Sequence, residues 1–599
     1  MTVIASPARN GARLRRTALA LGSAGVLALP CVAAAQAIPS PPTREELNVA
    51  PQTQAHVPRS RLTVEGGIEH GPCPLADPAF ANTKVLFSTV EFSGLPDVPA
   101  SALDSTWREY AGRELPIATL CEVRDRAATA LRGLGYLSAV QVPPQRIQAG
   151  GTVHMDVLTA RLTEVQLRGE PGPSASLIAA HLAKLTRERW FNSDQAERHL
   201  LLLGDLPGYT VRLVLRSADA GPGELIGDVV LERTGVELAI GAQNLGSRAN
   251  GREGAFALLA LNDLIGLGDR TTLSYYNSLD LKEQHILRAA EDLALGTSGL
   301  RFGASLLVGR SEPRVGVDFT TATFVGDLGL TYPLVRRQAQ TLIVGGGLEI
   351  ANQKLKLGST LISEDKLRIV HARLDFEATD RASIRGYRGF SLAEPRWRAA
   401  LLLELRKGIA GLGASNDCAP IANCLPPHVP ISNLLADPGA YVARLQGSLE
   451  FRPVRRLTLA VAPLAQWSDR PLLSYEQVSL GNYTIGRGFD PGVVLGDRAL
   501  GASFELRYGS VYPHRTNDFA FEPFVFLDIA KAWLDHSAGI AELHHVLSAG
   551  GGVRGRWGDH ADFSLIAAVP LERAGFQTTR DDPRVLLTLT TRLLPWRKR

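Results

Sequence analysis

The stretch Leu500-Gly-Ala-Ser-Phe-Glu-Leu-Arg-Tyr508 decides the fold class of this 599-residue chain. Its apolar side chains fall on every second residue, and Ser503, Glu505 and Arg507 fall between them. A period of two is the side-chain period of a β-strand. The same alternation runs through 396–406, 442–451 and 584–593, between turns rich in Gly, Asp, Asn and Pro. Residues 234–599 are therefore predicted to be all-β.

This alternation fits two architectures. A soluble sandwich would bury the apolar face, whereas an outer-membrane barrel would turn that face to lipid and the charges to a wet lumen. We mark sixteen candidate strands in 234–599, and an even number is typical of bacterial outer-membrane barrels. Short connections such as 263–268 alternate with long ones such as 408–438 and 470–498. The pattern favours a 16-stranded antiparallel transmembrane barrel.

Residues 1–37 have the pattern of a secretory signal peptide. Four arginines between Arg9 and Arg16 precede an apolar stretch at 17–30, and Ala35-Gln-Ala37 supplies a small-x-small cleavage site. The apolar stretch is too short for a membrane-spanning helix, which needs about 20 residues. The chain is therefore predicted to be exported.

Between the signal peptide and the barrel we predict two α+β modules in tandem. The strand ending Glu91-Phe-Ser-Gly94 is matched about 75 residues later by one ending Gln166-Leu-Arg-Gly169, and each copy holds helix-like stretches. The predicted organisation is a Pro-rich linker and N-terminal segment at 38–84, module 1 at 85–160, and module 2 at 161–233.

The cysteines support export. Apart from Cys31 in the predicted signal peptide, the chain has Cys73, Cys121, Cys418 and Cys424. In an oxidising compartment the natural pairing is Cys73–Cys121 and Cys418–Cys424. A zinc site is the alternative, but no histidine lies nearby at ligand spacing.

An ordered set of motifs carries a resemblance to a known family. The set comprises Arg132-Gly-Leu-Gly-Tyr-Leu137, Asp205-Leu-Pro-Gly208, Gln243-Asn-Leu-Gly-Ser247, Leu264-Ile-Gly-Leu-Gly-Asp-Arg270, and Ile485-Gly-Arg-Gly-Phe489 with Gly496-Asp-Arg498. In this order they resemble the outer-membrane transporters of two-partner secretion, the filamentous-haemagglutinin/haemolysin secretion-activator family within the POTRA-barrel superfamily. The resemblance implies that both modules are polypeptide-transport-associated (POTRA) modules.

The resemblance also implies an inward-folded sixth extracellular loop at about 470–498. Its Arg-Gly-aromatic tip would be Arg487, Gly488 and Phe489, and the arginine would contact an acid in a Phe-x-Asp-x-Gly pattern. The matching stretch is Phe526-Leu-Asp-Ile-Ala530, where alternation turns Asp528 toward the lumen. We therefore predict a loop latch between Arg487 and Asp528; the alternative is that Arg487 is a solvated loop charge.

Two departures from the family pattern stand out. Ala530 takes the place of the usual glycine, which would alter how closely the loop packs. The chain ends Trp596-Arg-Lys-Arg599 instead of in an aromatic residue, so the part that Trp596 plays in barrel insertion stays open.

The resemblance implies a transporter in the outer membrane of a Gram-negative bacterium, with its POTRA modules in the periplasm. The modules would capture a large secreted protein in extended form, and a monomeric barrel in outer-membrane lipid would export it without nucleotide hydrolysis. The alternatives are a general insertase of outer-membrane barrel proteins, against which the small number of modules argues, and a passive porin, which needs no modules. The sequence leaves open whether the segment before Cys73 plugs the barrel.

No catalytic, cofactor, metal or nucleic-acid site is predicted. Lys and Arg (64) nearly balance Asp and Glu (60), which excludes a strongly basic nucleic-acid binder. Neither Gly-x-Ser-x-Gly nor His-Glu-x-x-His occurs, and Gly266-Leu-Gly268 is not followed by the helix that a dinucleotide site needs. His544 and His545 are predicted to be solvated loop residues, and His371, Arg373 and Asp375 to line the lumen.

Overall fold

The computed structural model describes residues 41–48, 73–218, 221, 223–384, 386–515, 517–535, 541–575 and 579–595. The predicted signal peptide, much of the predicted linker and Trp596 lie outside the described residues. Among the helices in the described ranges, none combines the length and the apolar character needed to cross a membrane.

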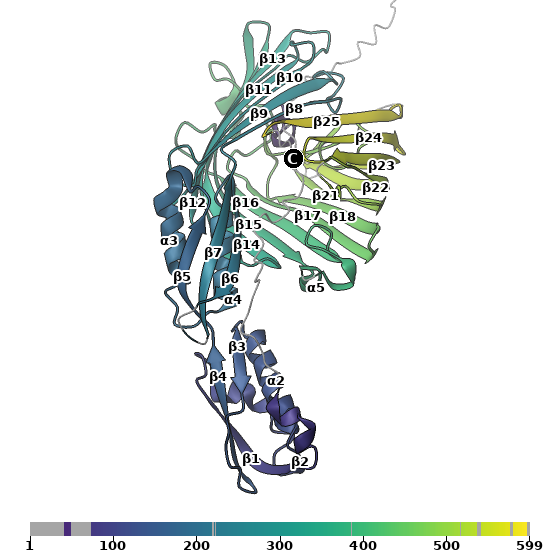
Figure 1. Cartoon of the computed structure of the whole chain (residues 1–599). Coiled ribbons are helices and arrows are strands. Elements are labelled where there is room, and N and C mark those ends of the chain that lie inside the picture. The colour runs from purple at the N-terminus through teal and green to yellow at the C-terminus, as the bar shows by residue number, and fades with distance from the viewer. Residues whose placement is uncertain are drawn as a thin grey trace, which may run out of the picture. The chain divides into compact units, whose positions relative to one another are not determined.

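The first module is a four-stranded sheet of order β2-β1-β4-β3 backed by one long helix (Figure 1). Leu120, Val123, Ala127 and Leu131 recur on one face of the helix and are buried against Phe87 and Met155 of the sheet. Its elements are η1 (Pro74–Ala76), η2 (Pro78–Phe80), β1 (Lys84–Ser93), η3 (Ala100–Thr106), β2 (Glu114–Pro116), α2 (Thr119–Gly133), β3 (Ser138–Gln141) and β4 (Gly151–Thr159).

The second module repeats this plan with a three-stranded sheet of order β5-β7-β6. Ile178, Leu203 and Leu213 lie in its core, and the Asn192 side chain caps the N-terminus of its second helix. Its elements are β5 (Arg161–Arg168), η4 (Gly172–Ser174), α3 (Ala175–Leu185), α4 (Ser193–Gly204), β6 (Tyr209–Ser217) and β7 (Glu224–Arg233).

Sixteen antiparallel strands then close into a barrel, because the last strand pairs with the first. This confirms the predicted fold class. The barrel strands are β8 (Val236–Gln243), β9 (Gly254–Asn262), β10 (Arg270–Ser278), β11 (Gln284–Ala294), β12 (Arg301–Ser311), β13 (Phe319–Arg336), β14 (Gln340–Leu357), β15 (Thr360–Thr379), β16 (Trp397–Gly408), β17 (Tyr441–Val454), β18 (Leu457–Ser468), β21 (Arg498–Tyr508), β22 (Phe519–Asp535), β23 (Ala541–Trp557), β24 (Ala561–Pro570) and β25 (Arg584–Leu594).

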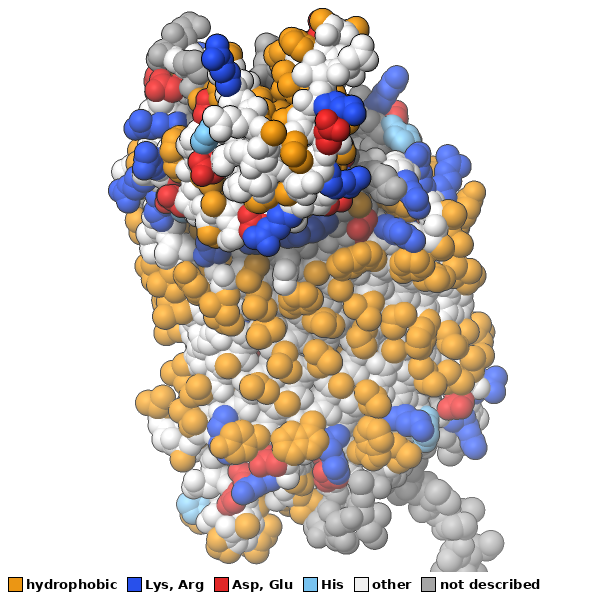
Figure 2. All heavy atoms as spheres, turned by 90° about the horizontal axis from the view of Figure 1, so that it is seen from below, with side chains coloured by type: hydrophobic (Ala, Val, Ile, Leu, Met, Phe, Trp, Pro, Cys, Tyr) orange, Lys and Arg blue, Asp and Glu red, His pale blue; other side chains and the backbone are white. Residues whose placement is uncertain are grey.

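The two faces of the barrel differ as the alternation predicts. Leu500, Phe504 and Leu506 of β21 are exposed on the outside, whereas Glu505 and Arg507 make ion pairs inside. Figure 2 shows the exposed apolar side chains as a belt, with charged side chains gathered beyond its two edges. A belt of this kind is what a lipid-facing barrel wall needs.

Three connections carry further elements. The β15–β16 connection holds α5 (Arg381–Ile384) and η5 (Tyr387–Gly389), and the β16–β17 connection holds η6 (Ile421–Cys424). The β18–β21 connection at 469–497 forms a two-stranded hairpin of β19 (Val478–Leu480) and β20 (Val494–Gly496). This is the predicted sixth loop, between the eleventh and twelfth barrel strands.

Helix α1 (Arg44–Leu47) lies within the ring of strands (Figure 1). Thr43 and Glu46 form a capping box, and Leu47 packs among inward side chains of the wall such as Phe256 and Leu307. On one side Gln353 Nε2 donates to the carbonyl of Pro42 (2.7 Å). The structure thus places part of the segment before Cys73 in the lumen.

The prediction that His544 and His545 lie in a loop was wrong. Both belong to β23, where they pair with Ala532 and Lys531 of β22. The two strands stay in register up to Asp535 and Ala541, so alternation turns His544 to the buried face and leaves His545 exposed. By contrast, His371 and Arg373 line the lumen cavity as predicted.

Candidate functional site

The hairpin loop at 469–497 is held in the barrel first by apolar burial. Its side chains Leu480, Ile485 and Phe489 pack against Ala530 and Val546 of the wall. Phe489 has no exposed surface, and burying a phenylalanine side chain stabilises by about 1.5–3 kcal/mol. The loop is therefore a packed part of the interior.

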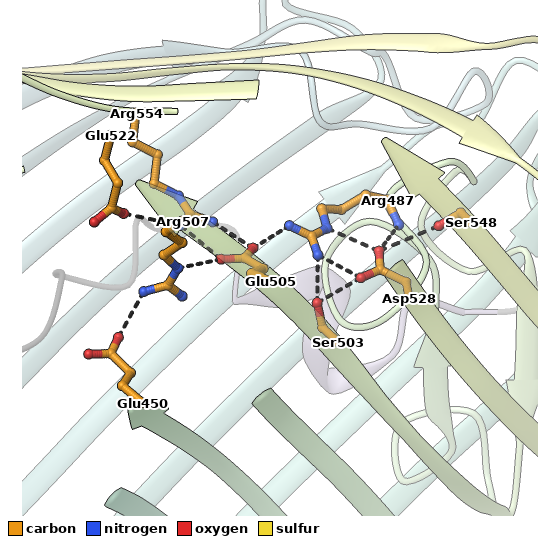
Figure 3. A network of polar contacts seen from close by, with 9 residues as sticks. All are labelled: Glu450, Arg487, Ser503, Glu505, Arg507, Glu522, Asp528, Ser548 and Arg554. Atoms are coloured by element: carbon orange, nitrogen blue, oxygen red, sulfur yellow. Dashed lines mark hydrogen bonds and ion pairs between the residues drawn. The ribbon is translucent and has the colours of Figure 1, made fainter. Parts of the chain in front are cut away.

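At the loop tip, Arg487 meets Asp528 of β22 in a two-pronged ion pair (Figure 3). Nη2 donates to Oδ1 (2.6 Å), Nε donates to Oδ2 (3.0 Å), and the backbone N–H of Arg487 also donates to Oδ2 (2.9 Å). The side chains are 12% and 1% exposed. Breaking a buried pair by removing one partner costs about 3–5 kcal/mol, because the other charge stays buried.

Glu505 and Ser503 of β21 complete the surroundings of Arg487. Glu505 forms a second ion pair with the guanidinium, and the Ser503 hydroxyl links Arg487 to Asp528, to which it donates at 2.7 Å. The guanidinium carbon also lies 3.7 Å from the ring centroid of Phe526, a cation–π geometry. Arg487 thus has partners on two neighbouring strands.

Glu505 is the centre of a larger charge network along the wall (Figure 3). Besides Arg487 it accepts from Arg507 (2.7 Å) and Arg554 (2.8 Å). Arg507 continues to Glu450 of β17 (2.8 Å). Every charge in this chain of contacts has an opposite neighbour, which is what keeps buried charges tolerable.

The glycines around Arg487 allow the tip to approach the wall. Gly486 has φ +120°, and a Cβ there would lie 2.5 Å from Cγ1 of Val546. A Cβ at Gly488 would lie 2.8 Å from the backbone nitrogen of Pro570. Side chains at either position would therefore push the tip away from Asp528.

Ala530 lies next to the latch. It is buried in the same apolar cluster as Ile485 and Phe489, and its Cβ fills the space over Gly501 of the neighbouring strand. The methyl group is thus part of the surface on which the loop packs.

The stem of the loop has a second buried anchor, which the sequence analysis missed. Arg406 of β16 binds Glu476 of the loop (2.8 Å) and Glu349 of β14 (2.7 Å). Helix α1 abuts this anchor, because the backbone N–H of Arg44 donates to the Tyr475 carbonyl (3.3 Å).

Two further ion pairs, Arg44–Glu404 (3.2 Å) and Glu45–Arg444, hold α1 to the wall. Beside α1 the lumen keeps a cavity of about 1120 Å³.

The partners that the sequence analysis missed could have been noticed from their inward position in the alternation of the strands. Ser503 and Glu505 stand on the inward face of the strand that first indicated the barrel, and Arg406 stands on that of β16. The sequence could not pair them with loop residues, because a loop has no fixed register.

The four cysteines that were predicted to pair form two disulfides. Cys73 is bonded to Cys121, which ties η1 to α2, and Cys418 is bonded to Cys424 in the β16–β17 connection. The part of the chain that the structure describes contains no group of residues suited to hold a metal ion.

Two family profiles match the chain. The profile described as Haemolysin secretion/activation protein ShlB/FhaC/HecB matches residues 326–555, and the profile described as POTRA domain, ShlB-type, matches residues 85–159. Together with the relatives below, these two matches support a two-partner secretion outer-membrane transporter. The first module is a POTRA module, and the chain is an outer-membrane protein whose POTRA region lies in the periplasm.

Named relatives agree with this assignment. The chain is 23% identical over 436 residues to an outer membrane transporter CdiB of Escherichia coli, and 22% identical over 438 residues to the CdiB of Escherichia coli O6:K15:H31 (strain 536 / UPEC). Each alignment covers 68% of this chain and 66% of the relative.

Solved structures show the same fold. CdiB from Escherichia coli superimposes with a TM-score of 0.67 at 19% identity, covering 92% of this chain and 94% of that one. CdiB from Acinetobacter baumannii gives 0.61 at 14% identity, covering 93% and 95%.

Proposed function

We propose that this chain exports one or a few large partner proteins through its barrel, in extended form and without nucleotide hydrolysis. The observation that carries the proposal is the filled lumen. A loop is anchored there by Arg487 and Arg406, and α1 is held beside it by ion pairs. Contacts of this kind suit a gate that opens for cargo, whereas a passive diffusion pore needs no such filling.

The proposed opening has two parts. Helix α1 is only four residues long and is held mainly by ion pairs inside the lumen, and Leu47 is its one buried apolar side chain, so its withdrawal exposes little apolar surface. The loop buries Phe489 and two arginine anchors, and it therefore forms the stronger part of the gate. We propose that the Arg487–Asp528 latch keeps the loop in the position that transport requires.

We propose that cargo docks on the periplasmic modules by adding a strand. The sheets end in β2 and β3 in the first module and in β5 and β6 in the second. Terminal strands offer unpaired N–H and C=O groups to an extended chain. Folding of the cargo outside the cell would then give export its direction.

Deleting this chain from its host tests the proposal. Proteins of the culture medium and outer-membrane barrel proteins are compared among the parent, the deletion strain and the strain complemented with the intact chain. Loss of one or a few large secreted proteins, with other barrels intact, is the expected result. A general fall in barrel proteins would instead favour an insertase, and no change in either fraction would contradict export.

A further inference from the structure

Four exposed arginines gather on one sector of the periplasmic rim. The second module leads directly into β8, so the connections after β9, β15 and β17 lie at the periplasmic end. The β15–β16 and β17–β18 connections are neighbours there, because their strands are adjacent in the barrel. They carry the exposed side chains of Arg381, Arg396, Arg455 and Arg456.

Among the described residues these arginines have no carboxylate partner, unlike Arg487 and Arg406 of the lumen. Within the described ranges none of the four forms an ion pair, and the only hydrogen bond from their side chains runs from Arg455 Nε to the Arg388 carbonyl (3.1 Å). The acids of the same connections are only partly exposed, and Asp380 is engaged in capping α5 through Ser383. The sector therefore has a net positive charge that the chain does not neutralise.

The sector borders the apolar belt directly. Trp397 follows Arg396 and is exposed on the outside, level with its cross-strand partner Phe451. Val454, next to Arg455, is 59% exposed. Aromatic and apolar side chains in such a row mark the edge of the hydrocarbon layer, where long basic side chains reach the headgroups.

The opposite sector of the rim also indicates contact with lipid, by different chemistry. The β9–β10 turn exposes Leu264 and Ile265 (60% and 59%), although the same turn is tied to the second module by the Ser174–Gly268 hydrogen bond. Apolar tips in one sector and unpaired arginines in another fit a rim that touches the periplasmic leaflet.

We propose that Arg381, Arg396, Arg455 and Arg456 bind the phosphates of anionic phospholipid headgroups in the periplasmic leaflet. The planar guanidinium donates two parallel hydrogen bonds to a phosphate, which suits it for this ligand. Trp397 and Val454, next to Arg396 and Arg455, face outward from the barrel, toward lipid and away from the path of a cargo chain through the lumen.

The test uses the full chain in nanodiscs of phosphatidylcholine, alone or mixed with phosphatidylglycerol. Native mass spectrometry measures which lipid stays bound. We expect the intact chain to retain phosphatidylglycerol preferentially. The double variants R455Q/R456Q and R381Q/R396Q should each weaken that binding by about 30-fold, from about 1 kcal/mol for each basic residue near an anionic surface.

A matched control is R187Q/R189Q, which removes two exposed arginines of the second module and should leave lipid retention unchanged. Heat-modifiable mobility on gels checks that every variant barrel is folded. Equal retention of phosphatidylglycerol by the rim variants and the intact chain would overturn the proposal. Unchanged lipid retention with weakened secretion would overturn it in favour of an acidic segment of the cargo.

Discussion

Ion pairs anchor the inward loop at two places, its tip and its stem, and the two places differ in which side supplies the arginine. At the tip, Arg487 belongs to the loop and its carboxylates Asp528 and Glu505 to the wall; at the stem, the wall supplies Arg406 and the loop supplies Glu476. The tip arginine is also fixed through its own backbone N–H. The difference teaches that the tip ion pair is fixed by backbone as well as side-chain contacts, whereas the Arg406–Glu476 pair of the stem is made by side chains alone.

Charge reversal at the tip should have the largest effect. Arg487→Glu would place a carboxylate beside Asp528 and Glu505, and we expect secretion of the cargo to fall to background, with a loss on the order of 3–5 kcal/mol of loop anchoring. Immunoblots of the medium measure it. Arg248→Glu reverses an exposed arginine outside the latch and should secrete normally; a similar loss there would show that the effect is not specific to the tip.

Removing the stem arginine should affect the opening of the lumen more than the latch at the loop tip. Arg406→Met removes the guanidinium that binds both Glu349 and Glu476, beside the point where α1 meets Tyr475. We expect α1 to leave the lumen more often, so that single-channel recordings show more open time while the Arg487 pairing persists. Unchanged recordings would mean that the stem pair does not hold the gate.

The sequence predicts the orientation of strand residues better than the contacts of a loop, because a strand has a fixed side-chain period and a loop has none. The alternation around Glu505 and Asp528 predicted the barrel and the inward face of both residues, because strands have a fixed period. The sixth loop and Arg487 followed from the family motif. Glu476, Arg406 and the position of α1 did not, because contacts between a loop and a distant strand leave no periodic signal.

A steric change at the loop tip should have a smaller effect on secretion than the charge reversal. Gly488→Ala adds a Cβ that would lie 2.8 Å from the nitrogen of Pro570, so the tip has to shift outward from Asp528. We expect secretion to be reduced but not abolished, with thermal stability of the barrel nearly unchanged. Gly303→Ala, at a barrel glycine without a positive φ whose added Cβ would lie 3.9 Å from the nearest atom, is the control for glycine replacement in the barrel. Normal secretion by Gly488→Ala would show that close approach at this position is not needed.

The smallest expected effect lies outside the barrel, in the second module. Burial lowers the pKa of His181 to about 4, from an ordinary value of 6.5, and nearby Lys184 adds to the shift. The unfolded module therefore binds a proton at His181 below about pH 6.5, whereas the folded module does not bind this proton until the pH falls to about 4. Stability contributed by neutral His181 is full above pH 6.5 and falls by about 2–3 kcal/mol as the pH drops toward 4.5.

Hydrogen exchange of amides in α3 and α4 of the full chain, at pH 7 and pH 4.5, measures this loss after correction for intrinsic rates. His181→Gln should flatten the pH dependence of the protection factors. An equal pH dependence in the variant would assign the effect to other groups.

The charge-exchange cycle at the latch tests the central claim most directly. Secretion of the cargo is measured for Arg487→Asp, for Asp528→Arg and for the chain carrying both changes. The account predicts that each single change blocks secretion and that the exchange recovers part of it. Adding Glu505→Gln should give further recovery, because the carboxylate introduced at position 487 would otherwise face Glu505. Normal secretion by both single variants would contradict the latch.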